Sequence, residues 1–171
     1  MARFPPTDGE SMTNTEPGPW PVETSGTVAV ASDIERGVTR LLLAHAIVSV
    51  VELPLPDGHR ADVVGIGADG RILIVEIKSS VADFRSDQKW QGYRAYCDEL
   101  YFAVSPAFPV EILPDDTGLI LADRYGGTFA RPAPAHPLSA ARRKAMTIRF
   151  ARTAGSRLIA ARDPQVRVPE L

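Results

Sequence analysis

Two carboxylates and one amine near the middle of the chain have the types and spacing that metal-dependent phosphodiester chemistry requires. Asp62 lies near the start of one apolar run, and Glu76 and Lys78 lie two residues apart at the end of the next. Residues two apart on a strand project from the same face, so Glu76 and Lys78 point together. If the two runs form a hairpin centred on Asp69, Asp62 lies directly opposite Glu76. The sequence therefore predicts that three ionisable side chains meet at one end of a hairpin.

The pairing of the two carboxylates predicts a cation between them. Like charges directly opposite each other destabilise a sheet unless a positive charge compensates them. Hard divalent cations such as Mg²⁺ take oxygen ligands, often one or two carboxylates together with water and phosphate. An adjacent ammonium group would stabilise the charge that develops on phosphorus during hydrolysis. We therefore expect a hard divalent cation such as Mg²⁺ at Asp62 and Glu76, with Lys78 beside it.

The alternative is a surface hairpin that carries an ordinary Glu–Lys pair. A surface strand is polar along one whole face, whereas the run from Ile72 to Val75 is apolar at every position. Such a run is typical of a strand that is buried on both faces. The pattern therefore favours a buried strand with charge only at its end.

The composition fits one globular domain and excludes several classes of protein. The chain has 171 residues, of which 44% are hydrophobic and 23% charged, so a sizeable core is expected. The formal net charge of −2 excludes a binder of nucleic acid that is basic over its whole surface. The single cysteine, Cys97, excludes a disulfide framework, and no run of about 20 apolar residues predicts a membrane span.

The elements that must position these residues follow from periodicity and turn signals. Residues 1–31 are rich in Pro, Ser, Thr and Gly and predict a disordered N-terminal tail, while 164–171 form a short C-terminal tail. The domain between them, 32–163, begins with a helix that Ser32 and Glu35 would cap as a capping box. The other expected elements are strands at 48–53, 99–105, 118–124 and 127–131, the central hairpin, and helices at 81–97 and 138–161.

The order of these elements predicts a mixed sheet flanked by helices, an α/β (α+β) fold. The first three strands can form an antiparallel meander, and the helix after the third strand can cross over to a parallel fourth strand. The strand at 99–105 is apolar on both faces and is expected near the centre of the sheet. Within the helix at 81–97, Trp90, Tyr93 and Cys97 share a stripe that favours core packing.

The chain resembles two nested groups of proteins. Asp62 followed by Glu76-Ile77-Lys78 on a hairpin resembles the PD-(D/E)XK nuclease signature, although Ala61 stands where the signature has Pro. More closely, residues 34–161 resemble the MmcB-like DNA repair proteins of bacteria. The runs that carry this resemblance are IERGVTRLL, LPLPDGHRADV, VEIKSS, DFRSDQKWQGYRAYCDELYFAV, GLILADRYG and RKAMTIRFAR.

The resemblance implies a restriction-endonuclease-like fold, a role in DNA repair, and a set of site residues. Asp62 and Glu76 would bind Mg²⁺ or Mn²⁺, Lys78 would orient water and stabilise the transition state, and Glu35 would complete the metal site. The capping box is the other interpretation of Glu35. Some relatives carry Q-x-x-x-Y on the helix after the lysine. Here Lys89 stands in the Gln position before Tyr93, with Gln88 beside it, which leaves the role of this helix open.

The last predicted helix concentrates positive charge. Between Leu138 and Ala161 there is no acidic residue, and Arg142, Arg143, Lys144, Arg149, Arg152 and Arg157 follow one another, with Arg162 just beyond. Such a strip is expected to contact DNA phosphates, as are Gln88 and Lys89 after the hairpin. The alternative is a solvated face whose cations interact favourably with the helix C-terminus.

These observations give two main hypotheses for the function. The first is a bacterial cytoplasmic, nucleoid-associated repair protein that hydrolyses DNA phosphodiester bonds as a Mg²⁺- or Mn²⁺-dependent endonuclease-like enzyme. The second is a catalytically weak or inactive accessory module that binds DNA or recruits a repair-protein partner through the same fold. An RNA-directed enzyme is a third hypothesis. By analogy with nucleases of this fold, a homodimer is also considered.

Overall fold

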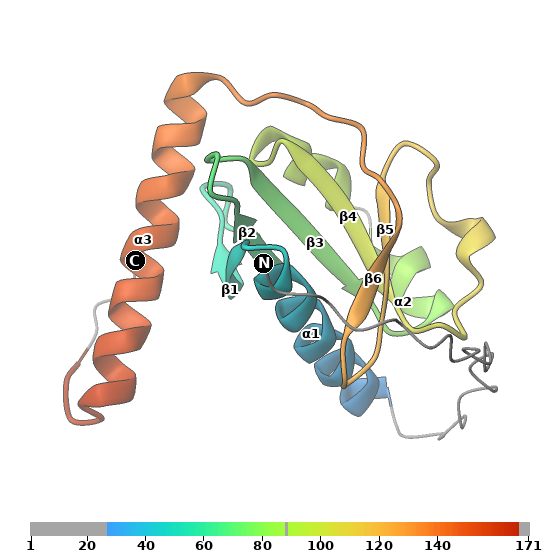
Figure 1. Cartoon of the computed structure of the whole chain (residues 1–171), viewed down its shortest axis with the longest axis horizontal. Coiled ribbons are helices and arrows are strands. Elements are labelled where there is room, and N and C mark those ends of the chain that lie inside the picture. Colours follow the sequence, from blue (N-terminus) through green and yellow to red (C-terminus); the bar gives the residue numbers. More distant parts are fainter. Residues whose placement is uncertain (1–26, 88, 168–171) are drawn as a thin grey trace, which may run out of the picture.

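The computed structural model describes residues 27–87 and 89–167, which form one six-stranded sheet with helices on both faces (Figure 1). The strands lie in the sheet in chain order. Their bounds are β1 (Val48–Pro54), β2 (Arg60–Ile66), β3 (Ile72–Lys78), β4 (Glu99–Val104), β5 (Gly118–Ala122) and β6 (Gly127–Arg131). The helices are α1 (Thr27–Ala44), α2 (Val81–Ser86) and α3 (Ala140–Arg162), with 3₁₀ turns η1 (Trp90–Ala95) and η2 (Val110–Ile112).

The sheet topology confirms the predicted mixed sheet. β1, β2 and β3 form an antiparallel meander, and β3 pairs with β4 in parallel after the crossover through α2 and η1. β4 and β5 are also parallel, whereas β5 and β6 are antiparallel. The predicted hairpin register is confirmed as well, because Val63 pairs with Val75 and Val64 with Ile74. The β2–β3 turn needs a left-handed backbone, which Gly70 supplies with a φ of 80°.

Two hydrophobic clusters, one on each face of the sheet, bury β3 completely. On one face Leu73, Val75 and Ile77 pack against α1. On the other face Ile72 and Ile74 pack in the cluster that holds η1 and α3. That second cluster includes Trp90, Tyr93 and Cys97, so the core role predicted for this stripe is confirmed. A strand buried on both faces is what its continuous apolar run requires.

The first helix begins earlier than the sequence predicted. α1 starts at Thr27, so residues 27–31 are helical, and residues 1–26 of the predicted tail lie outside the described residues. Ser32 therefore lies inside the helix, and the predicted capping box with Glu35 is wrong. The physical reason is that Val30 and Ala31 are partly buried against the core, so packing extends the helix beyond the local capping signal.

The predicted helix at 81–97 is broken in two. α2 ends at Ser86, and Asp87 has an extended backbone with φ −87° and ψ 113°. The Asp87 carboxylate accepts a hydrogen bond from the Lys89 N–H at 2.8 Å, and such a local bond competes with continued helix. The chain resumes as η1 from Trp90. The break brings the Asp87 side chain to the end of β3, where it contacts Lys78.

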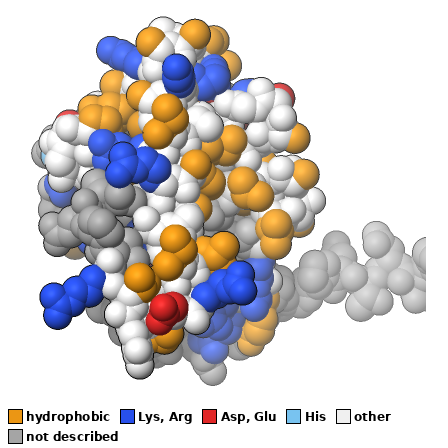
Figure 2. Space-filling model, turned by 90° about the vertical axis from the view of Figure 1, so that its left-hand side faces the viewer, with side chains coloured by type: hydrophobic (Ala, Val, Ile, Leu, Met, Phe, Trp, Pro, Cys, Tyr) orange, Lys and Arg blue, Asp and Glu red, His pale blue; other side chains and the backbone are white. Residues whose placement is uncertain are grey.

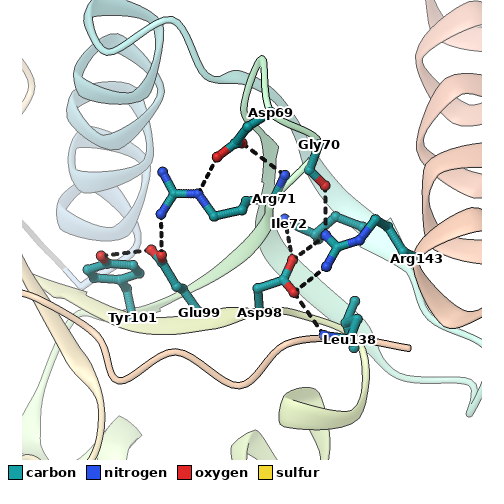
Figure 3. A network of polar contacts seen from close by, with 9 residues as sticks. All are labelled: Asp69, Gly70, Arg71, Ile72, Asp98, Glu99, Tyr101, Leu138 and Arg143. Carbon is teal, nitrogen blue, oxygen red and sulfur yellow. Dashed lines mark hydrogen bonds and ion pairs between the residues drawn. The ribbon is translucent and has the colours of Figure 1, made fainter. Parts of the chain in front are cut away.

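A buried carboxylate ties the start of α3 to the sheet (Figure 3). Asp98, which is 4% exposed, accepts hydrogen bonds from the N–H groups of Ile72 at 2.8 Å and Leu138 at 2.9 Å. Both terminal nitrogens of Arg143 also donate to it, at 2.6 and 2.7 Å, and Arg143 donates further to the Gly70 carbonyl. The start of β3, the residue before β4 and the first turn of α3 are thereby held together at the end of the sheet opposite Glu76.

Substituting Gly37 by Ala is expected to destabilise the protein by about 2 kcal/mol, as overpacking of a close contact does. A Cβ at Gly37 would lie 2.0 Å from the Asp123 carbonyl oxygen and 2.5 Å from that of Gly126, so the β5–β6 turn would have to move. Gly155→Ala in α3 is the matched control, because a Cβ there meets nothing within 4 Å. Urea unfolding should show a loss for the first variant and a gain of up to about 1 kcal/mol for the second. Equal stabilities would contradict the close packing of α1.

Candidate active site

The two strands of the central hairpin separate where Asp62 and Glu76 face each other. The backbone pairing continues up to Val63 and Val75 and is then replaced by bonds to side chains. The Asp62 N–H donates to Glu76 Oε1 at 3.5 Å, and the Ile77 N–H donates to Asp62 Oδ2 at 2.7 Å. Each carboxylate thus reaches across to the other strand's backbone. The predicted juxtaposition of Asp62 and Glu76 is present in the structure.

Lys78 lies beside this pair of carboxylates. Its Nζ is 3.5 Å from Glu76 Oε2 and 2.5 Å from Asp87 Oδ2. Lys78 and Glu76 are almost fully buried, at 4% and 3% exposure. Both, together with Asp62, line a cavity of about 890 Å³ that opens between α1, α2 and the ends of β1, β2 and β3. The structure therefore brings the three predicted catalytic residues to one cavity.

Burial raises the pKa values of the two carboxyl groups, Asp62 and Glu76. Burial is the largest cause that raises the pKa of Asp62 to about 6, against hydrogen bonding from Ile77 and the charge of Lys78, which lower it. Burial, followed by repulsion from Asp62, raises the pKa of Glu76 to about 8. The positive charges near Asp62 and Glu76 therefore do not fully offset the energetic cost of ionising both carboxylates. An added cation would relieve this cost.

The Lys78 amine remains protonated at neutral pH. Burial alone would lower the pKa of Lys78, but the hydrogen bond from its ammonium to Asp87 and the charges of Glu76, Asp87 and Asp83 outweigh burial and raise it. Lys78 is thus a fixed positive charge in the cavity. It suits electrostatic stabilisation rather than proton abstraction.

Glu35 and Glu52 line the same cavity. Glu35 is half-buried, and burial followed by the charge of Glu52 raises its pKa, so these two side chains are near enough to repel each other. Glu52 also forms an ion pair with Arg60. Glu35 was predicted at this site from the sequence, whereas Glu52 was not. The signal was available, because a hairpin turn centred on Asp57 puts Glu52 opposite Asp62.

The backbone of Glu52 has an unusual conformation at the rim of the cavity. Its φ is 50°, in the left-handed region that costs a non-glycine residue about 1–3 kcal/mol. Consequently the side chains on either side point to different faces: Val51 packs with the α1 cluster and Leu53 with the other. Arg157 of α3 donates to the carbonyl oxygens of Val51 and Glu52 and so holds this segment of the edge strand.

Asp83 and Asp87 also line the cavity, although neither was predicted there from the sequence. Asp83 accepts hydrogen bonds from the backbone N–H and the hydroxyl of Ser79, and it lies in the first turn of α2. Asp87 holds Lys78. The strand pattern could not identify either residue, because the position of Asp83 depends on where α2 begins and that of Asp87 on where α2 ends. The ionisable lining of the cavity is predominantly acidic.

The residues predicted to bind DNA divide into several groups. Lys89 is exposed at the rim of the cavity, and Gln88 lies outside the described residues. Arg142 and Lys144 are exposed on α3, whose face shows Lys and Arg side chains among hydrophobic ones (Figure 2). Arg143 and Arg149 have partners within the fold: Asp98 and Gly70 for the first, and the Pro54 carbonyl at 3.2 Å for the second.

The donor set suits a hard divalent cation bound partly by water or phosphate. Asp62 and Glu76 offer oxygens, which Mg²⁺ and Mn²⁺ prefer, and Mg²⁺ often uses one or two carboxylates with substrate phosphates. Within residues 27–87 and 89–167, no group of three or more His, Cys, Asp or Glu side chains is arranged to hold a metal ion. Glu35 therefore lines the cavity without forming a three-ligand group with Asp62 and Glu76.

The fold and the site define a mixed α/β protein with a cavity that holds buried acids and a lysine at the ends of three antiparallel strands. The model of the family described as "DNA repair protein MmcB-like" matches residues 20–165, and the chain belongs to this family. A solved structure described as "SPO1766 protein of unknown function from Silicibacter pomeroyi" is 46% identical, with a TM-score of 0.78. The match covers 81% of this chain and 94% of that one.

The comparison with curated proteins gave no match. No helix in the described part of the chain combines the length and the hydrophobicity needed to cross a membrane. The family description indicates a role in DNA repair.

Proposed function

We propose that the protein is a Mg²⁺- or Mn²⁺-dependent phosphodiesterase that cuts DNA, with a site of the PD-(D/E)XK type. The observation that carries the proposal is the meeting of Asp62, Glu76 and Lys78 in one open cavity. The family description supplies the connection with DNA.

The residues of the chain divide the work by charge. Asp62 and Glu76 would hold the divalent cation, which when bound supplies charge neutralisation and a lowered pKa of its water. Lys78 keeps a positive charge next to the place where negative charge develops on the phosphoryl group. Asp87 and Glu76 fix the position of the Lys78 ammonium.

The acidic lining supports a dependence on metal ions. Six carboxyl groups line the cavity, from Glu35, Glu52, Asp62, Glu76, Asp83 and Asp87, and even with Glu76 protonated they outnumber the cationic side chains of Arg60, Lys78 and Lys89. A DNA phosphate that approached this cavity alone would be repelled. A divalent cation between the phosphate and the carboxylates turns this repulsion into attraction. Binding of the substrate and binding of the cation should therefore be coupled.

A second candidate function is a repair accessory that binds DNA or a protein partner without cutting. Two observations favour it. Lys78 is already bound to Asp87 at 2.5 Å, and the described residues provide no group of three carboxylate or histidine ligands. An accessory module would bind DNA in a salt-dependent manner and cut none with either cation.

Lys78→Met is expected to lower the rate of DNA cleavage by about 10²–10³-fold, the usual cost of losing one preorganised electrostatic contact. The methionine keeps the apolar stem and removes the charge. Because that charge is proposed to act mainly on the transition state, the affinity for DNA should change less than about twofold. The measurement is cleavage of labelled single-stranded, branched and duplex DNA with Mg²⁺ or Mn²⁺. Arg167→Met, which removes an exposed cation that does not line the cavity, is the control and should retain most activity.

Three results would decide between the two functions. Cleavage by the Lys78→Met variant at the parent rate would refute the role of Lys78. Salt-dependent DNA binding by the parent without cleavage under any metal condition would establish the accessory function instead. Loss of cleavage in Lys78→Met with retained binding would support the phosphodiesterase.

A further inference from the structure

The turn between β5 and β6 displays an aromatic side chain in a fixed backbone setting. Tyr125 is 71% exposed. The Asp123 carboxylate accepts hydrogen bonds from the N–H groups of Tyr125 at 2.8 Å and Gly126 at 3.1 Å, and the Asp123 N–H donates to the Gly126 carbonyl at 3.0 Å. A single exposed apolar side chain is common on protein surfaces. What distinguishes Tyr125 is how its turn is held and what surrounds it.

Helix α1 clamps this turn from one side. Arg40 donates from one terminal nitrogen to the carbonyl oxygens of Arg124 at 2.8 Å and Tyr125 at 3.3 Å. Arg124 forms an ion pair with Asp33 at 3.1 Å. Gly37 lets the helix approach the turn so closely that a Cβ would clash with two of its carbonyl oxygens. The backbone that carries Tyr125 is therefore rigid, and little ordering is needed before a ligand binds.

The same helix separates the turn from the acidic cavity. Asp33, Gly37 and Arg40, at intervals of four and three residues, form the stripe of α1 that faces the turn. Ser32 and Glu35 line the cavity on the other side of the helix. The exposed Arg36 lies four residues before Arg40 and between these two stripes on the outer surface. A path from cavity to turn thus crosses one helix diameter, about 10–12 Å, past two arginines.

We propose that Tyr125 stacks on an unpaired base of a DNA strand whose backbone crosses the outer surface of α1 past Arg36 and Arg40 toward the cavity. The inference rests on the proposed function, because the cavity is where that strand would be cut. Aromatic side chains with basic neighbours are the usual platform for single strands, since every base has a stacking face. Bases of a duplex are stacked on each other and do not offer that face, so the ligand class is single-stranded or locally unpaired DNA.

The test is the binding of a fluorescently labelled 12-nucleotide single strand to the full chain in EDTA, where no cleavage occurs, measured by anisotropy. Tyr125→Ala should weaken binding by about 5- to 150-fold, the range for one lost base–aromatic contact. Tyr125→Phe should bind within about twofold of the parent, because stacking needs the ring and not the hydroxyl. Arg36→Gln should weaken binding less and reduce its salt dependence by about one phosphate contact. Thermal unfolding of each variant checks that the fold is unchanged.

An oligonucleotide series identifies the stacked base. With one abasic position moved along the strand, the parent should lose affinity most at one position, and Tyr125→Ala should show no such loss there. Equal binding of single strands by Tyr125→Ala and the parent would overturn the inference, as would an equal loss in Tyr125→Ala and Tyr125→Phe. In either case, intact cleavage that depends on Lys78 would leave the proposed function standing. A parent that binds no DNA in EDTA and none with Mg²⁺ or Mn²⁺ would overturn both.

Discussion

In EDTA at pH 8, the Glu76→Gln variant is expected to be more stable than the parent by about 2 kcal/mol, although with a divalent cation it should cleave DNA far more slowly. Burial and the charge of Asp62 raise the pKa of Glu76 from 4.5 to about 8, so the folded protein opposes ionisation of this group. A neutral amide of the same shape removes that cost. Under the proposed function, removing this ligand of the divalent cation should at the same time lower cleavage by about 10³-fold or more, since such a cation contributes several kcal/mol to the transition state.

The sign of the pH dependence follows from proton linkage. Between pH 4.5, where Glu76 titrates in the unfolded chain, and about 8, where it titrates in the folded protein, the folded state binds more protons. Stability must therefore fall as the pH rises through this window. Asp62, whose pKa is raised to about 6, adds to the same slope at its lower end. The parent should lose stability from pH 5 to pH 8, and Glu76→Gln should lose much less.

Divalent cations should reverse this loss in the parent alone. At pH 8, added Mn²⁺ should raise the unfolding temperature of the parent, because a ligand that binds only the folded state stabilises it. The variant should respond weakly. Glu111→Gln, an exposed carboxylate of η2, is the control and should behave as the parent in pH profile and in metal response. A flat pH profile for the parent, or an equal Mn²⁺ response in both proteins, would contradict the assignment of Glu76 as a buried metal ligand.

The arrangement of the candidate site residues was predictable wherever it depended only on strand periodicity and one turn. The period of two and the Asp-Gly turn at 69–70 fix which residues of β2 and β3 face each other, and the observed pairing of Val63 with Val75 follows that rule. Lys78 follows from the same period. Glu52 depends on a second hairpin, whose centre could be inferred, and on a positive φ that nothing in the local sequence indicates.

The partners of long side chains could not be predicted, because they depend on contacts distant in sequence. Arg143 counted as a phosphate contact in the basic run of α3, yet it binds Asp98, 45 residues away. Asp87 became a partner of Lys78 only because α2 ends at Ser86. The start of α1 was likewise set by the packing of Val30 and Ala31. Periodicity gave the strand order, and tertiary contacts decided the remaining details of the helices.

The buried ion pair between Asp98 and Arg143 should contribute more to stability than any exposed ion pair of the protein. Asp98→Asn is expected to cost about 3 kcal/mol, as breaking a buried charge pair does. The asparagine NH₂ group would face N–H donors of Ile72, Leu138 or Arg143, and two donors cannot satisfy each other. Urea unfolding at pH 7 measures the loss.

The control is the same substitution at an exposed ion pair. Asp116 lies 2.6 Å from Arg94 but its side chain is 68% exposed, so Asp116→Asn should cost less than about 1 kcal/mol. Equal costs for the two variants would show that the Asp98 pair has no special role in holding α3 to the sheet. A cost confined to Asp98→Asn would support that role.

The stability contributed by Asp98 should be lost as the pH falls, whereas the effect of Glu76 lowers stability as the pH rises. Burial alone would raise the pKa of Asp98, but the hydrogen bonds from Arg143, Ile72 and Leu138 outweigh it and hold the pKa below 3.8. The stability that this lowered pKa provides is fully present above pH 3.8 and is lost as the pH falls through the folded-state value. The Asp98→Asn variant should therefore lack this loss of stability at low pH, while its stability should still decline as the pH rises toward 8. Glu76 near the end of β3 and Asp98 beside its start therefore lower stability at high and at low pH respectively, which places the most stable pH of the metal-free protein on the acid side of neutrality.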